Sequence, residues 1–152
     1  MKFNIFTFVV LLYFTNCLNC SKKVKKYIMK ICSKKTKAKE EKGKWIIGCG
    51  LSDEDYSITH KRIIKNTVEK EKKIVNWHLK KLITIIEPEL NKYMNNFNWK
   101  QHEFDALCIY GTKGNSVQNI CKNANNKLSI QLQLKSPEKE IFKKGKYNFK
   151  YF

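Results

Sequence analysis

Three histidines are the first residues in this sequence with the potential for chemistry, and they stand at His60, His78 and His102. In a small basic protein, two imidazoles and a lysine are the groups that a ribonuclease uses as base, acid and phosphate ligand. His60 and His78 lie 18 residues apart on what the sequence predicts to be one helix. That spacing separates them by about 27 Å, too far for one scissile bond. His102 is followed by Glu103 but not by the second histidine, four residues on, that a zinc protease helix needs. We therefore predict a protein that is not an enzyme, with no catalytic residues, no metal ligands and no cofactor.

Residues 1–20 predict a signal peptide. A short polar start precedes an apolar run over residues 5–14, and a polar stretch follows before the lysines begin. The apolar run is about half of the ~20 residues that a membrane-spanning helix needs, so cleavage is favoured over a permanent anchor. Cleavage after Cys17 and cleavage after Cys20 both satisfy the preference for small residues before the cut. We take Ser21 as the first residue of the secreted chain.

The cysteines predict two disulfides in the secreted chain. Removal of the signal peptide takes away two of the six cysteines and leaves an even number in an oxidising pathway. The four that remain are Cys32, Cys49, Cys108 and Cys121. No two of them have the spacing of a zinc site, so metal binding is the weaker alternative. Of the three pairings we favour Cys108 with Cys121, because two glycines and an asparagine form a turn midway between them, and this leaves Cys32 with Cys49.

The chain carries a formal net charge of +18, from 31 lysines and arginines against 13 acidic residues. Such an excess favours anionic partners, either nucleic acid or acidic proteins. Arg62 is the only arginine, and lysine reads bases poorly because it lacks the bidentate geometry of the guanidinium group. We therefore predict binding without sequence selectivity. An A+T-rich genome is the alternative explanation, since its codons raise the lysine and asparagine content without any selection for binding.

Residues 21–44 are the most basic stretch and are predicted to form a flexible arm, because their lysines repel one another. At its start, Val24, Tyr27, Ile28 and Ile31 share one face of a short amphipathic helix. Two clusters of the form K-K-x-K in this arm are spaced like a bipartite nuclear signal, for which a host importin would be the partner. The predicted anion-binding and nuclear-targeting residues are Lys22, Lys23, Lys25, Lys26, Lys34, Lys35, Lys37 and Lys39.

The remainder, residues 45–152, is predicted to be one globular domain of the α+β class. From residue 53 to 86, apolar residues recur every eleven positions, which predicts a long amphipathic helix that Pro88 ends or kinks. Apolar residues alternate with polar ones over 128–134, and aromatic residues alternate over 147–151, which predicts two strands of a hairpin. We expect the long helix to pack on a small antiparallel sheet stabilised by disulfides. An all-α bundle is the alternative.

The export signal, the lysine-rich and A+T-biased composition and the basic clusters at residues 22–25, 34–37 and 143–146 occur together in this chain. In these features it resembles the small secreted effectors that parasites, including plant-parasitic nematodes, deliver into host cells. The resemblance is compositional and covers the whole chain. It implies a secreted protein that acts in the host nucleus or cytoplasm and binds host nucleic acid or an acidic host protein.

Three alternatives to an effector remain open from the sequence. One is a secreted protease inhibitor similar to the cystatin type, although the Q-x-V-x-G loop of that type is not present. Another is a toxin that makes transient contact with membrane surfaces through the amphipathic segment 22–31. A small basic ribonuclease is the least favoured.

Overall fold

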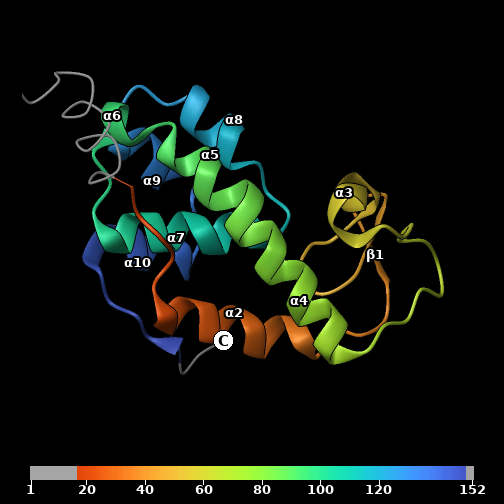
Figure 1. Cartoon of the computed structure of the whole chain (residues 1–152). Coiled ribbons are helices and arrows are strands. Elements are labelled where there is room, and N and C mark those ends of the chain that lie inside the picture. The colour runs from red at the N-terminus through yellow and green to blue at the C-terminus, as the bar shows by residue number, and fades with distance from the viewer. Residues whose placement is uncertain (1–16, 150–152) are drawn as a thin grey trace, which may run out of the picture.

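Helix α7 (Gln101–Thr112) lies at the centre of the structure (Figure 1). The computed structural model describes residues 17–149, and every residue from Glu103 to Ile109 is buried. A helix that is buried on all sides has to be covered by other elements. The elements that pack on it are α2 (Lys22–Ser33), η2 (Leu82–Ile86), α5 (Glu87–Asn91), α8 (Val117–Lys122) and α10 (Glu138–Lys144).

A second, smaller apolar cluster lies beneath the hairpin of β1 (Lys39–Glu41) and β2 (Lys44–Ile46) and beneath α3 (Tyr56–Thr59). It is at one end of α4 (Glu71–Lys81) (Figure 1). Two of its buried side chains, Ile74 and Trp77, come from α4, and η2, which continues α4, contributes Leu82 and Ile86 to the large cluster around α7. The predicted α+β class, with a small antiparallel sheet and a disulfide, is confirmed, and helices dominate it. The remaining elements are η1 (Asp53–Asp55), α6 (Met94–Phe97) and α9 (Lys127–Gln133).

Strands β1 and β2 form the only sheet found within residues 17–149. They pair antiparallel, with Lys39 opposite Ile46. The two turn residues, Lys42 and Gly43, have φ angles of +49° and +77°. Two positive φ angles in a two-residue loop match the right-handed twist of the flanking strands, which fixes the register of this hairpin.

The predicted single helix over residues 53–86 is wrong in its first half. Only η1 and α3 form there, and α3 ends at His60, whose φ of +49° is left-handed. The chain then crosses the surface to α4 without a helix. In this half the eleven-residue repeat does not mark one buried face of a helix, because Ile63 is buried while Ile64 and Val68 are 50% and 54% exposed.

In the second half, Pro88 does not end the helix. Elements α4, η2 and α5 follow one another without a break, so the proline lies within a continuous helical segment. The element before it, η2, is a π-helical turn. In a π turn each carbonyl bonds to the N–H group five residues further on instead of four. The carbonyl that would otherwise face the proline, which has no N–H group, can therefore bond to the residue after it.

The predicted strand over residues 128–134 is also wrong, since this segment is helix α9. Asn126 caps it by accepting a hydrogen bond from the Ser129 N–H group at 2.9 Å. Ile130 and Leu134 are buried four residues apart, whereas Leu128 and Leu132 are 59% and 66% exposed. Only two of the four alternating leucine and isoleucine side chains are therefore buried. The N-cap hydrogen bond of Asn126 stabilises the helix over a strand.

The predicted flexible arm is corrected, because residues 21–44 belong to the folded body. The amphipathic helix expected at its start is confirmed as α2, with Val24, Tyr27, Ile28 and Cys32 buried. Its first turn is capped by Ser21, which accepts a hydrogen bond from the Val24 N–H group. Most of the predicted signal peptide, residues 1–16, lies outside the described residues.

The buried carboxylate of Asp105 on α7 connects the two ends of the described chain. One oxygen accepts hydrogen bonds from the Ser21 N–H group at 2.8 Å and from the Gln101 side chain at 3.0 Å. The other accepts from the Tyr147 hydroxyl at 2.6 Å. Tyr147 and Phe149 were predicted to lie in a strand, but no strand is found among residues 145–149, and residues 150–152 lie outside the described part.

We expect Asp105→Ala to destabilise the protein by about 3 kcal/mol or more, because it leaves several donors without their charged acceptor. Tyr147→Phe removes one of these bonds and should cost about 1 to 2 kcal/mol. Urea unfolding followed by tryptophan fluorescence measures both. Equal losses for the two variants would contradict a shared role of Asp105 in holding both chain ends.

Candidate anion-binding face

Four lysines of α2 and its C-cap form a stripe along one face of the helix. Ser21 starts the helix, and Lys23, Lys26, Lys30 and Lys34 then recur at intervals of three or four residues. Side chains at such intervals lie on one helical face. All four lysines are exposed, whereas Val24, Ile28 and Cys32 on the other side of the helix are buried.

A groove of about 520 Å³ runs beside this stripe. Its apolar floor consists of Tyr27, Ile31 and Phe149. The rings of Tyr27 and Phe149 are stacked with their centroids 4.2 Å apart, so the C-terminal segment forms one wall against α2. The lysines around this floor are Lys23, Lys26, Lys30, Lys34 and Lys35.

A second groove of about 400 Å³ adjoins the first, since Lys34 and Lys35 line both. It continues along the segment after α2 and along β1, where Lys37, Lys39 and one acid, Glu41, line it. We call the lysines of the two grooves the cationic face. Its members are Lys23, Lys26, Lys30, Lys34, Lys35, Lys37 and Lys39.

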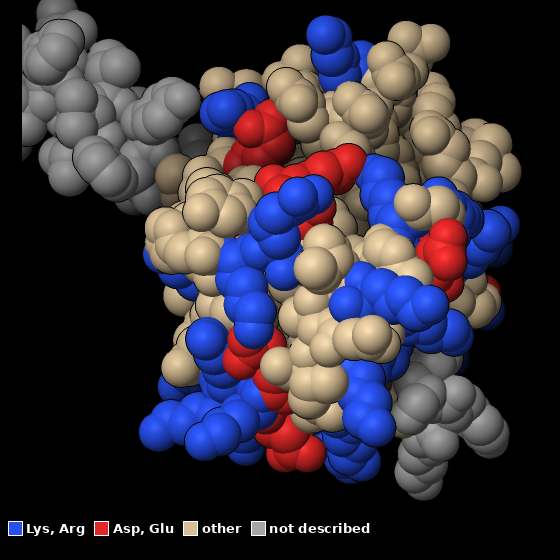
Figure 2. Space-filling model, turned by 90° about the vertical axis from the view of Figure 1, so that its right-hand side faces the viewer, with Lys and Arg blue, Asp and Glu red and all other residues tan. Residues whose placement is uncertain are grey.

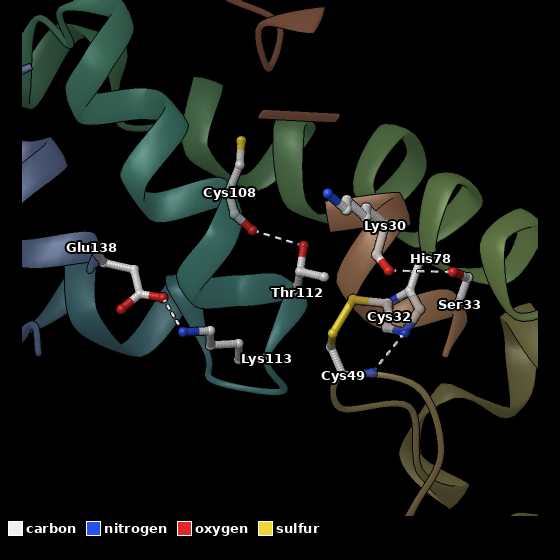
Figure 3. Close-up of a disulfide and its surroundings, with 9 residues drawn as sticks. All are labelled: Lys30, Cys32, Ser33, Cys49, His78, Cys108, Thr112, Lys113 and Glu138. Atoms are coloured by element: carbon white, nitrogen blue, oxygen red, sulfur yellow. Dashed lines mark hydrogen bonds and ion pairs between the residues drawn. A yellow bond between two sulfur atoms is a disulfide. The ribbon is translucent and has the colours of Figure 1, made fainter. Parts of the chain in front are cut away.

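None of the lysines of the cationic face forms an ion pair within residues 17–149. Most of the acids are engaged elsewhere, and several are buried against a lysine, such as Glu138 with Lys113 at 2.5 Å (Figure 3). Figure 2 shows the side of the molecule that carries the hairpin, α3 and the first turns of α4, where lysine and arginine side chains also cover much of the surface. Unpaired lysines therefore line the two grooves, and others lie elsewhere on the described surface.

The structure changes the predicted site at three positions. Lys25 points toward the body and pairs with the buried Glu87 at 3.7 Å, so it is not part of the cationic face. Lys22 is exposed in the first turn of α2 but is not among the residues that line the grooves. Lys30, which lies outside the K-K-x-K clusters, lines the groove instead. Its helical spacing from Lys26 and Lys34 is the signal in the sequence that would have found it.

The disulfide Cys32–Cys49 anchors the C-terminal end of α2, as predicted (Figure 3). Cys32 is in the last turn of the helix and Cys49 follows the hairpin, so the bond fixes the segment that carries the second groove. The other predicted disulfide is wrong, because Cys108 and Cys121 are separate buried thiols on α7 and α8. The turn between them leads from one helix to the next and does not bring their side chains together.

His78 lies next to this disulfide and is hydrogen-bonded to the backbone of Cys49 (Figure 3). Its Nε2 atom accepts a hydrogen bond from the Cys49 N–H group at 3.0 Å. The neighbouring Gly48 has a φ of +62°, and a Cβ atom there would stand 2.2 Å from the same nitrogen, so only glycine fits. Burial, followed by the charges of Lys81 and Lys35, lowers the pKa of His78 from 6.5 to about 3. The imidazole is therefore neutral at physiological pH and serves as a structural acceptor.

We expect His78 to make the protein less stable as the pH falls from about 6.5 toward 3. In this window the unfolded chain binds a proton at His78 and the folded chain does not. Stability should therefore drop by about 1.4 kcal/mol per pH unit. Urea unfolding at several pH values measures the slope, and His78→Gln should remove this part of it. His60→Asn, at an exposed histidine, is the control and should leave the slope unchanged.

The three histidines do not form a common site. His78 is enclosed behind the disulfide, His60 ends α3, and His102 on α7 contacts the Ile141 carbonyl oxygen on α10 through its Nδ1 atom at 3.0 Å. Among residues 17–149 no group of three histidine, cysteine or acidic side chains is placed to hold a metal ion. In the same part of the chain, no helix has the length and apolar character required to span a bilayer.

Comparison with protein-family models, with curated proteins and with solved structures finds no match for this chain. The cationic face and its surroundings are therefore the features of this chain from which a function can be inferred.

Proposed function

We propose that this chain is a secreted, non-enzymatic cationic protein that binds an anionic macromolecule through the cationic face. The observation that carries the proposal is the grouping of seven lysines around two adjoining grooves without an ion pair among the described residues. Unpaired charges of one sign along a groove attract a polyanion, whereas paired charges do not. Nucleic acid and acidic proteins both meet this requirement.

The chemistry of the face favours contacts with a charged backbone over the reading of bases. Lysine is a point charge without the planar fork of arginine, so it neutralises phosphates or carboxylates without selecting a sequence. The aromatic floor adds a surface on which an unpaired base can stack. Within nucleic acids, single strands should therefore bind at least as well as duplexes.

The first test removes charge from the cationic face. The triple variant Lys26→Gln, Lys30→Gln and Lys34→Gln should weaken binding to a fluorescent single-stranded oligonucleotide tenfold or more. The slope of log K against log salt should decrease by about 0.9 for each phosphate contact that is lost. Fluorescence anisotropy at several salt concentrations measures both quantities.

The matched control removes three charges from other surfaces, with Lys65→Gln, Lys80→Gln and Lys122→Gln. These lysines are exposed and form no ion pair within residues 17–149, so the two triple variants have the same net charge. If both variants weaken binding equally, the grooves have no special role and only the net charge matters. Binding that does not respond to salt would exclude the electrostatic mechanism altogether.

The effector version of this proposal places the protein in a host nucleus or cytoplasm. In support, the cluster at residues 34–37 lies in the exposed segment after α2, while the cluster at residues 22–25 is part of the first turn of that helix. The cluster after α2 is therefore the better candidate for contact with an importin.

A fluorescently tagged chain that starts at Leu18 should accumulate in the nucleus when it is expressed in host-type cells. Replacement of Lys34, Lys35 and Lys37 by alanine should abolish this accumulation. The same replacement in the third cluster, at Lys143, Lys144 and Lys146, is the control and should not. Confocal microscopy gives the ratio of nuclear to cytoplasmic signal, and a diffuse signal from the unmutated chain would contradict the nuclear version.

A further inference from the structure

Two buried cysteines, Cys20 and Cys108, lie in the same apolar cluster and are not used by any disulfide of the structure. Cys20 is 4% exposed and Cys108 is not exposed at all. They are 88 positions apart in the sequence, so their proximity is produced by the fold and not by local chain geometry. Cys20 also lies within the predicted signal peptide, where a packed core residue is not expected.

Hydrogen bonds hold the backbone around Cys20 against the central helices. The Cys20 N–H group donates to the Glu87 carboxylate at 3.0 Å, and the next N–H group, that of Ser21, donates to Asp105 at 2.8 Å. Asp105 lies three residues before Cys108 on α7, so the two project from the same face of that helix. Cys20 is thus held directly over the part of α7 that carries Cys108.

The Cys20 side chain also acts on the Cys108 thiol, since a hydrogen bond to Cys20 is, after burial, a cause of the raised pKa of Cys108. Burial, this bond and the nearby carboxylates of Glu87 and Asp105 raise the pKa of the Cys108 thiol. Cys121 has different surroundings, since burial and Glu89 raise the pKa of its thiol to about 12. Cys20, whose backbone is bonded to Glu87 and whose neighbour Ser21 is bonded to Asp105, is therefore the better partner for Cys108 than Cys121 on α8.

We propose that Cys20 and Cys108 are the sites of a second disulfide, which forms when the chain folds in an oxidising compartment. The step needs a disulfide oxidant such as oxidised glutathione. One cysteine thiolate attacks it, gives a mixed disulfide and releases one glutathione thiol. The second cysteine then attacks the mixed disulfide, which forms the Cys20–Cys108 bond and releases the second glutathione thiol. Two protein thiols are oxidised and one glutathione disulfide is reduced.

A Cys20–Cys108 disulfide requires that the secreted chain keep Cys20 at its N-terminus. Cleavage after Cys20 would remove one partner of the pair, whereas cleavage after Cys17 keeps it. The segment kept in this way is already built into the fold, because the Asn91 side chain bonds to both the N–H group and the carbonyl oxygen of Leu18 at 2.9 Å. The disulfide would then attach the start of α2, and with it the cationic face, to α7.

The experiment determines which sulfurs are linked in the full chain. Reduced, unfolded protein is refolded in a glutathione redox buffer, remaining thiols are alkylated, and the chain is digested with trypsin without reduction. We expect the peptide that ends at Lys22 to be linked to the peptide Gln101–Lys113, and the intact protein before alkylation to have lost the mass of four hydrogens. Cys121 should carry the alkyl group.

Single variants assign the link within the N-terminal peptide, which also contains Cys17. Cys17→Ser and Cys121→Ser should keep the link, and Cys20→Ser should abolish it and leave Cys108 alkylated. A link from Cys108 to Cys121 or to Cys17 would overturn the proposal, as would a product with only Cys32–Cys49 joined. If refolding yields no soluble chain, the same mapping is done on protein expressed through a eukaryotic secretory pathway. There, a mature N-terminus at Ser21 would overturn it. None of these outcomes depends on whether the cationic face binds an anion.

Discussion

The carboxylate of Asp105 imposes a constraint on which much of the remaining structure depends. A charged group in the middle of a buried helix must be surrounded by donors, because an unsatisfied buried carboxylate is very costly. Here the donors come from both ends of the described chain, with Ser21 on one side and Tyr147 on the other. This requirement brings the segment before α2 and the segment after α10 onto the same helix. The stacking of Phe149 on Tyr27, and with it one wall of the first groove, follows from this convergence.

Acidic residues are scarce in this chain, and the fold uses many of them inside. Glu87, Glu103, Asp105 and Glu138 are all buried, and each accepts backbone or side-chain donors or pairs with a lysine. Carboxylates that serve the core are not available to neutralise the surface. The lysines of the cationic face therefore remain without acidic partners for a structural reason, whatever the origin of the lysine excess.

Strong positive charge makes the compact state less stable through self-repulsion, and the region that carries the cationic face is correspondingly braced. Cys32–Cys49 closes the end of α2 onto the segment after the hairpin, and the neutral imidazole of His78 accepts the Cys49 N–H group behind it. A charged histidine at this place would add a further cation beside Lys35 and Lys81. Burial of a neutral ring thus suits a surface that is already crowded with positive charge.

The prediction of α2 succeeded because four apolar positions at helical spacing and a serine cap are local properties, and nothing in the tertiary structure opposes them. The predicted strand at 128–134 failed for the opposite reason. A segment with two-residue alternation forms a sheet only beside a partner strand, and no partner strand is found for this segment within residues 17–149. It forms a helix instead, which buries Ile130 and Leu134 and leaves Leu128 and Leu132 exposed. The turn between Cys108 and Cys121 has the composition of a hairpin turn, but it connects two helices and leaves the two thiols apart.

By itself the sequence determined the charge of the protein, the amphipathic helix that displays much of it, and the cysteine pair at the end of that helix. These depend on composition and on spacings of a few residues, which act before any distant contact is made. Only the tertiary structure decided that Lys25 turns inward and that Cys20 packs beside the part of α7 that carries Cys108. Each of these depends on residues more than 60 positions apart, such as Lys25 with Glu87, and such contacts are selected by the packing of the whole core.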